Sequence, residues 1–519
     1  MKIERTKNAT RNIIFGTMLK VYQLLVPFLI RTAMIHYMGV EYLGLSSLFT
    51  SILQVLNLAE LGVGSAMVFS MYKPIAEDDT MTICALMRLY RLYYRVIGGV
   101  IAVIGLILTP FIPNLIKGDL PPELNVYVLY LLNLGATVLS YWLFAYKNAL
   151  FSAHQRTDMT SKITLGTNTF QYISQLIIII FIKDYYLYVI VLLSTQALTN
   201  IITAIAANRM YPNYKPVGKL DKRQIQAINH RIRDLFTSKL GTVIISSSDT
   251  VVISAFLGLT ALAIYQNYYY ILTAITGIVT IIFQACTAGI GNSITVESEE
   301  KNYKDLKKFT FLITWLVGFC VCCLLCLYQT FMEIWVGKDL MLKFSAVICF
   351  CLYFFITEIN QLLNTYKDAG GIWHEDRFRP LITGLTNVTL NLITVQYWGL
   401  YGVVLSTVIS MLVVGMPWLL HNLFTVLFDR KWAKEYIIKL LFYTFIIGVS
   451  CVICYFVCTF FSFSSLWITF IVRAIICCVI SNTLYLVVYH RSIEFKQCVK
   501  LVDNMTGGKL KLEKRIVRD

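Results

Sequence analysis

Long apolar stretches, separated by short polar and charged connections, follow one another along almost the whole chain of 519 residues. Most of them contain about twenty residues or more, the length that an α-helix needs to cross the hydrocarbon core of a bilayer. The pattern predicts an all-α polytopic membrane protein with about fourteen transmembrane helices. The predicted spans lie near residues 12–38, 44–71, 92–113, 125–151, 160–182, 185–208, 234–257, 262–290, 308–332, 344–366, 378–397, 399–425, 437–461 and 464–489.

A polar loop between two of these stretches occurs twice. Tyr, Lys, Ala and His recur in the same register, at positions 146, 147, 149 and 154 and again at 366, 367, 369 and 374. Glycines repeat in the same order, since Gly39 is matched by Gly258, and the Gly-Val-Gly segment 62–64 by the Gly-Ile-Gly segment 289–291. Matches in one order at nearly constant separation indicate a duplicated unit.

The duplication predicts how the chain is organised. Residues 1–209 would form an N-terminal six-helix repeat, 210–233 a cytoplasmic linker and 234–429 a C-terminal six-helix repeat. Because each repeat has an even number of spans, both enter the membrane from the same side, which predicts parallel repeats. Residues 430–490 add two helices. Residues 491–519 form a basic cytoplasmic tail that either lies on the anionic inner leaflet or is solvated; its apolar residues include Leu501, Leu510, Leu512 and Ile516.

Charge supports a membrane protein and predicts its orientation. The chain is 57% hydrophobic and 14% charged, whereas a soluble domain carries about 25% charged residues. Of the 45 Lys and Arg residues, 37 lie in connections on the side of the N-terminus or within about four residues of them at the span ends, 4 lie in the opposite connections and 4 lie deeper within spans. Cytoplasmic loops carry this excess, so both termini are predicted to be cytoplasmic. The basic balance therefore gives no reason to infer binding to nucleic acid.

Enzyme classes are disfavoured by what the sequence lacks. The predicted external connections are too short for a catalytic domain, and no glycine-rich phosphate loop is present. The fourteen cysteines lie mostly inside apolar spans without metal-ligand spacing, so we interpret them as small packing residues. We predict a transporter with no metal or other cofactor, apart from a coupling proton or sodium ion.

Charged residues inside spans are costly and usually face a cavity or a partner. Arg31 in the first span and Asp249 at the matching depth of the second repeat are predicted to line a substrate cavity between the halves; a static ion pair is the alternative. Lys20, Lys239 and Arg473 are further cavity candidates, although the two lysines could instead reach the membrane interface and Arg473 could serve packing.

Two acidic residues near mid-membrane, Glu60 and Glu358, are candidates for ion coupling; each could instead be a protonated, hydrogen-bonded carboxyl. Amides in the spans are suited to binding sugars, but for most of them interhelical hydrogen bonding is the better interpretation. They are Gln171, Gln175, Gln266, Asn267, Gln284, Asn360, Gln361, Asn364, Asn387 and Asn391. The repeated loops supply candidates for capping or gating: Lys147, His154, Lys367, His374, Arg377 and Arg379.

Three segments carry a resemblance to a known family. They are residues 38–45 (Met-Gly-Val-Glu-Tyr-Leu-Gly-Leu), residues 58–65 (Leu-Ala-Glu-Leu-Gly-Val-Gly-Ser) and the loop 369–380. With the span pattern, they resemble the multidrug/oligosaccharidyl-lipid/polysaccharide (MOP) exporter superfamily, and within it the bacterial flippases for lipid-linked O-antigen and capsule repeat units. The first span carries Pro27 and Arg31 but lacks the acid that is frequent in the drug-export branch, which favours an anionic substrate.

The resemblance implies a MATE-like fold in the bacterial inner membrane and alternating access. It also implies a polyprenyl-diphosphate-linked oligosaccharide as substrate, with its diphosphate neutralised by cations such as Arg31 and its tail left in the lipid bilayer. A polysaccharide polymerase and chain-length proteins are implied partners. Two alternatives stay open: a cation-coupled drug or metabolite antiporter of the same fold, and more remotely a membrane glycan-processing enzyme.

Overall fold

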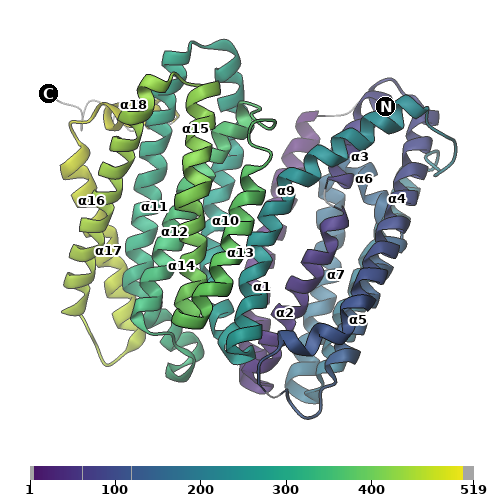
Figure 1. Cartoon of the computed structure of the whole chain (residues 1–519), viewed down its shortest axis with the longest axis horizontal. Coiled ribbons are helices and arrows are strands. Elements are labelled where there is room, and N and C mark those ends of the chain that lie inside the picture. Colours follow the sequence, from purple (N-terminus) through teal and green to yellow (C-terminus); the bar gives the residue numbers. More distant parts are fainter. Residues whose placement is uncertain (1–4, 61, 119, 506–519) are drawn as a thin grey trace. The chain divides into compact units, whose positions relative to one another are not determined.

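The computed structural model describes residues 5–60, 62–118 and 120–505, and these contain helices and connections without any strand (Figure 1). Each of the fourteen segments predicted to span the membrane is largely helical. The all-α prediction is confirmed.

The chain divides into two compact units, Met1–Gln266 and Asn267–Asp519, with the boundary inside one long helix, α10 (Leu259–Val296). The first unit contains α1 (Arg5–Tyr37), α2 (Val40–Leu56), η1 (Asn57–Glu60), α3 (Val63–Ala76), α4 (Thr80–Leu108), η2 (Thr109–Leu115), α5 (Val126–Trp142), η3 (Ala145–Lys147), α6 (Asn148–Ala153), α7 (Thr157–Ile177), the π-helical turn η4 (Ile178–Ile182), α8 (Tyr185–Met210) and α9 (Lys222–Leu257). The second contains α11 (Glu299–Val336), η5 (Lys338–Leu340), α12 (Phe344–Ala369), α13 (Arg379–Trp398), α14 (Leu400–Ser410), the π-helical turn η6 (Met411–Gly415), α15 (Met416–Val426), η7 (Arg430–Trp432), α16 (Ala433–Thr459), α17 (Leu466–Tyr489) and α18 (Ile493–Met505).

In the first unit, α1 packs against α7, α4 against α5, and α7 and α5 against α8. Helix α9 packs against α2 and belongs to this unit by its contacts, whereas the predicted repeat boundary assigns it to the second half. Gly44 of α2 permits a close approach of the backbone at the start of α10, because a Cβ at this position would lie 2.3 Å from the carbonyl oxygen of Leu259. The predicted repeat boundaries stay a prediction.

In the second unit, α11 is the central helix and contacts α12, α16, α17 and α18. The two helices of the predicted 430–490 segment, α16 and α17, lie beside each other and against α11 (Figure 1). The tail begins with the short helix α18, which also packs on α11. Of the tail residues named above, Leu510, Leu512 and Ile516 lie outside the described residues.

Polar caps fix where several helices begin. Asp79 accepts a hydrogen bond of 3.0 Å from the backbone of Thr82. Hydrogen bonding from the side chain of Thr82, and secondly from its backbone, lowers the pKa of the Asp79 carboxyl. Asn125 and Asp184 cap α5 and α8 in the same way. Because Asp79 caps α4, the helix begins at Thr80, which is twelve residues before the predicted start at residue 92.

The predicted second span, residues 44–71, is not one helix. It is α2 followed by the 3-10 turn η1, and a new helix α3 starts after Gly62, whose φ of 87° lies in the left-handed region. Glycine adopts this conformation without the steric cost that a Cβ would bring. The hydrophobicity of the sequence gives no sign of this break, because α2 and α3 are both apolar.

The predicted count of fourteen spans is not confirmed. In the described residues, eleven helices are long and apolar enough to cross a membrane, or twelve if α5 and the η3–α6 segment, bent by 48°, form one span. The two remaining predicted spans are the interrupted α2–α3 pair and α13. Helix α13 carries several Thr and Asn residues, which lower its apolar character.

Candidate functional site

The first unit contains a cavity of about 900 Å³. Helices α3, α4, α5, α6, α7 and α8 all contribute to its wall, and α1 adds Gln23. Its lining is Gln23, Glu60, Gly64, Ser65, Val68, Phe69, Tyr72, Tyr90, Tyr94, Ser140, Tyr141, Ala145, Asn148, Ala149, Ser152, Thr164, Asn168, Gln196, Thr199 and Asn200. Most of these side chains are amides, hydroxyls or tyrosines. Ligand pockets in proteins commonly have volumes of about 300–1,000 Å³.

One carboxylate lies at the centre of a hydrogen-bond network in this cavity. The Tyr94 hydroxyl donates to Glu60 Oε1 at 2.5 Å, and the Tyr141 hydroxyl donates to Glu60 Oε2 at 2.6 Å. Tyr90 in turn donates to the Tyr94 hydroxyl at 2.8 Å. The rings of Tyr94 and Tyr141 stack with centroids 5.4 Å apart. Both carboxylate oxygens are therefore held by phenols from two different helices.

The break in the second predicted span gives Glu60 its position. Glu60 is the last residue of η1, and Gly64, at the start of α3, also lines the cavity. A Cβ at Gly64 would lie 3.1 Å from the Tyr90 hydroxyl oxygen, so glycine leaves room for the network. Interrupted helices at membrane depth occur where the backbone lines a cavity or is buried in protein.

The polar wall is suited to hydrogen-bonding a hydroxyl-rich ligand. Asn200 donates to the Ser140 carbonyl at 2.8 Å, and Gln196, Thr199 and Asn200 follow one another on one face of α8. Among its described lining residues, the cavity contains Glu60 as its acid and no Lys or Arg.

The predicted cavity pair lies on two helices of the first unit. Arg31 on α1 is half-buried, and its positive charge interacts electrostatically with the hydroxyl of Tyr188 on α8. Asp249 on α9 is 5% exposed. Neither is a lining residue of the cavity described above. Their role toward a substrate stays a prediction.

The other predicted cations differ in their surroundings. Lys20 on α1 and Lys239 on α9 are exposed. Arg473 on α17 donates to Thr330 Oγ1 of α11 at 3.1 Å and to Ser462 Oγ of the α16–α17 connection at 3.1 Å. These contacts join α17 to α11 and to the α16–α17 connection, and a role of Arg473 toward a substrate stays a prediction.

The two predicted coupling residues occupy different units. Glu60 lies in the cavity of the first unit, whereas Glu358 on α12 is fully buried in the second, near Thr276 of α10 and Cys320 of α11. Of these two acids, Glu60 is the one whose carboxylate lines a cavity and is accessible to a ligand.

The first repeated loop is anchored to α8 and the segment that follows it. The Lys147 ammonium donates to Asn208 Oδ1, and the buried His154 ring stacks on Tyr211 at 4.3 Å. His154 Nδ1 contacts the Leu150 carbonyl at 2.9 Å. Burial lowers the pKa of His154, because the charged imidazolium would be desolvated.

The second repeated loop has a different construction. His374 is exposed and contacts Arg377 at 3.1 Å. The anchor is Asp376, which is 2% exposed and accepts two hydrogen bonds from Arg379, at 2.6 and 2.8 Å, while Lys367 lies 3.6 Å away. The two histidines share a sequence register without sharing an environment.

Several important residues were not predicted from the sequence. None of the predicted amides lines the cavity; Asn387, for example, donates to Thr407 within the second unit, in line with interhelical bonding. Two buried carboxylates, Asp158 in the first turn of α7 and Asp376 in the α12–α13 connection, were also missed. The spacing of Gln196, Thr199 and Asn200 was the available signal for the cavity wall.

Cysteines that are far apart in the sequence also lie close together in the structure. The buried thiols of Cys326, Cys458 and Cys477 lie within 4.8 Å of one another.

Comparison with known proteins gives a family and a fold. Residues 9–287 match the family described as "Polysaccharide biosynthesis protein". No curated protein sequence gives a significant match.

Solved structures share the fold at low sequence identity. The lipid II flippase MurJ in an inward closed conformation superposes with a TM-score of 0.63 at 15% identity, over 92% of this chain and 99% of that chain. An inward-facing multidrug resistance MATE family transporter of the MOP superfamily gives 0.62 at 14% identity, over 80% and 99%. A MOP superfamily transporter from Pyrococcus furiosus gives 0.55 at 14% identity, over 82% and 96%.

Proposed function

Because the chain belongs to the polysaccharide biosynthesis protein family of the MOP superfamily, we propose that it is a flippase for a polyprenyl-diphosphate-linked oligosaccharide. The substrate is a repeat unit of a surface polysaccharide, such as O-antigen, capsule or exopolysaccharide, carried on undecaprenyl diphosphate. It moves from the cytoplasmic to the outer leaflet by alternating access.

The observation that carries this proposal is the composition of the cavity in the first unit. Its wall offers five amide side chains, several hydroxyls and four tyrosines around a volume of about 900 Å³. Sugar hydroxyls need donors and acceptors to replace their water, and aromatic rings cover the apolar faces of the sugar. A wall of this kind compensates for the water that a glycan head group loses on leaving the cytoplasm.

The diphosphate and the tail require different surroundings from the sugar. A diphosphate without a cation is prohibitively costly to transfer through hydrocarbon, and Arg31 is our first candidate for this contact. The polyprenyl tail stays in the lipid throughout.

We assign Glu60 the coupling role. A proton taken up by the carboxylate would make one of its two oxygens a donor, and the phenol bound to that oxygen, Tyr94 or Tyr141, would have to reorient, while the other phenol could keep its hydrogen bond. Protonation would thereby change the hydrogen-bonding character of the sugar-binding wall once in each cycle.

The test is a chromosomal deletion complemented with variants. Deletion should abolish surface glycan and cause glycan-loaded undecaprenyl diphosphate to accumulate on the cytoplasmic leaflet. Wild type should restore the glycan, and Glu60→Gln should reduce flipping about tenfold to a hundredfold, the equivalent of ~1.5–3 kcal/mol for a hydrogen bond to a charged group. Glu41→Gln is the matched control, since Glu41 is an acid at the start of α2 outside the cavity lining. Normal glycan in the deletion strain would overturn the proposal.

The setting of this activity follows from the same proposal. The protein would reside in the bacterial inner membrane with both termini in the cytoplasm. A polysaccharide polymerase and chain-length proteins would receive the flipped repeat unit on the outer side.

A cation-coupled drug or metabolite antiporter is the second candidate, and one observation favours it. The cavity combines a carboxylate with Phe69, Tyr72 and Tyr90 and has no Lys or Arg among its described lining residues, which suits an organic cation. Drug susceptibility of the deletion strain separates the two candidates. Increased sensitivity with intact surface glycan would select the antiporter.

A further inference from the structure

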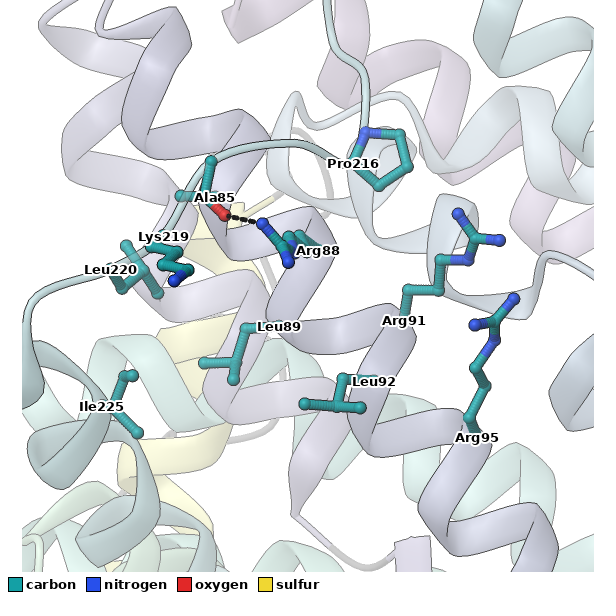
Figure 2. A pocket seen from close by; sticks show the side chains of 11 residues that line it. Ala85, Arg88, Leu89, Arg91, Leu92, Arg95, Pro216, Lys219, Leu220 and Ile225 are labelled. Carbon is teal, nitrogen blue, oxygen red and sulfur yellow. Dashed lines mark hydrogen bonds between the residues drawn. The ribbon is translucent and has the colours of Figure 1, made fainter.

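A second cavity in the first unit lies outside the site described above. It has a volume of about 480 Å³ and lies between α4, the connection before α9 and the first turn of α9 (Figure 2). Its lining is Ala85, Arg88, Leu89, Arg91, Leu92 and Arg95 from α4, Pro216, Gly218, Lys219 and Leu220 from the connection, and Ile225 from α9.

Four cationic side chains and no acidic ones line this cavity. Arg88, Arg91 and Arg95 follow at helical spacing on one face of α4, and Lys219 approaches from the connection (Figure 2). Like charges on neighbouring helical turns repel one another. In the described part of the chain, no carboxylate forms an ion pair with Arg91, Arg95 or Lys219. A bound anion would remove this repulsion.

The cavity is built by a contact between the connection and α4. Arg88 donates a hydrogen bond of 2.9 Å to the carbonyl oxygen of Gly218, whose φ of 92° turns the chain at this point. This bond holds the connection against α4, and Lys219, the next residue in the chain, lies on the Arg88 side of the cavity in Figure 2. Cations from two segments that are far apart in the sequence therefore line one cavity.

The cavity lies where lipid head groups are expected. The helical segment made of α4 and η2 runs over 36 residues, Thr80–Leu115, whereas about twenty residues cross the hydrocarbon core. The segment from Arg95 to Leu115 has that length, so Arg88, Arg91 and Arg95 lie at the interface on the predicted cytoplasmic side.

Apolar surface continues directly from the charged surface. Leu92 is 54% exposed and Val96 is 57% exposed on α4, beside Arg91 and Arg95. Leu89, Leu220 and Ile225 add apolar lining inside the cavity. A free anion would use only the cations, whereas a lipid uses both kinds of surface.

We propose that this cavity is a binding site for the phosphate group of an anionic phospholipid of the cytoplasmic leaflet. Arg91 and Arg95, whose guanidinium groups lie side by side in Figure 2, bind the phosphate oxygens, since guanidinium groups match phosphate geometry, and Lys219 adds positive charge from the connection. The acyl chains lie against Leu92 and Val96, and the bound lipid fastens the connection to α4.

The experiment measures lipid retained by the purified full chain. The protein is exchanged into phosphatidylcholine nanodiscs containing a small fraction of phosphatidylglycerol, and bound phosphatidylglycerol is measured by native mass spectrometry. Wild type should retain it. The double variant Arg91→Gln/Arg95→Gln should bind it about thirtyfold more weakly, the equivalent of ~2 kcal/mol for two basic residues at a membrane surface.

The matched control is Arg209→Gln/Arg223→Gln, which removes two exposed arginines from the same predicted side outside the cavity lining. Its affinity should stay close to wild type. If this control loses as much affinity for phosphatidylglycerol as Arg91→Gln/Arg95→Gln, general surface charge attracts the lipid. If Arg91→Gln/Arg95→Gln retains as much phosphatidylglycerol as wild type, the cavity does not bind it. Either result overturns the proposal.

Two further measurements keep the test decisive. Lys219→Gln changes an exposed residue in a connection, so it should fold and still weaken retention even if the double variant proves unstable. Inorganic phosphate and undecaprenyl diphosphate serve as competitors. Displacement by millimolar phosphate would overturn a lipid site, and preferential binding of undecaprenyl diphosphate would replace the phospholipid with the transport substrate.

Discussion

At the residue scale, His154 provides a test of how the first repeated loop is held. The ring is 4% exposed, lies against Tyr211, and its Nε2 atom is buried without a hydrogen-bond partner in the described part of the chain. Protonation would place a charge and an unsatisfied donor in this environment, which is why burial lowers the pKa of His154 below its usual value near 6.5.

The sign of the resulting pH dependence follows from proton binding. Between the lowered folded-state pKa and about 6.5, the unfolded chain binds more protons at His154 than the folded chain, so stability falls as the pH decreases through this window. We expect the melting temperature in detergent to fall between pH 7 and pH 5, and His154→Phe, which keeps an aromatic ring on Tyr211, to reduce that fall. His374→Gln is the control, because it changes the exposed histidine of the matching loop. An unchanged pH profile in His154→Phe would contradict the prediction.

At the scale of elements, the α12–α13 connection depends on one buried carboxylate. Asp376 joins Arg379, the first residue of α13, to Asn422 of α15, whose amide donates to Asp376 Oδ1 at 3.0 Å. Replacing one partner of a buried ion pair leaves the other charge uncompensated, at a cost of about 3–5 kcal/mol. We therefore expect Asp376→Ala to lower the melting temperature strongly. Asp368→Ala removes an exposed partner of Lys367 and should cost at most about 1 kcal/mol. Similar effects of the two substitutions would show that burial does not matter here.

The elements also show which features a sequence can reveal. The positions of most long helices were predictable because the apolar run of each is local and long. The break before Gly62 was not, because the apolar residues of α2 and α3 continue the hydrophobic run on both sides of it. Glu60 was identified from its unusual place in an apolar span, yet its partners Tyr94 and Tyr141 lie 34 and 81 residues away. Contacts over such separations depend on the packing of whole helices, and no local pattern encodes them.

At the scale of the whole molecule, the asymmetry of 37 against 4 basic residues predicts that both termini are cytoplasmic. A fluorescent protein fused after residue 519 should fluoresce, and alkaline phosphatase fused at the same place should be inactive. Phosphatase inserted in the connection 114–123 should be active, because this segment is predicted to be external and serves as the positive control.

An active phosphatase at the C-terminus would invert the topology, and the consequences would reach both proposed sites. The cationic cavity at Arg91 and Arg95 would then face the outer leaflet, and the phospholipid proposed there could not belong to the cytoplasmic leaflet. The basic residues would then no longer support the proposed direction of glycan transport, from the cytoplasmic to the outer leaflet. If the reporters agree with the prediction, the interface at Arg88–Arg95 and the anchored loops at His154 and Asp376 all lie on the cytoplasmic side. That is the side from which a lipid-linked glycan would have to enter.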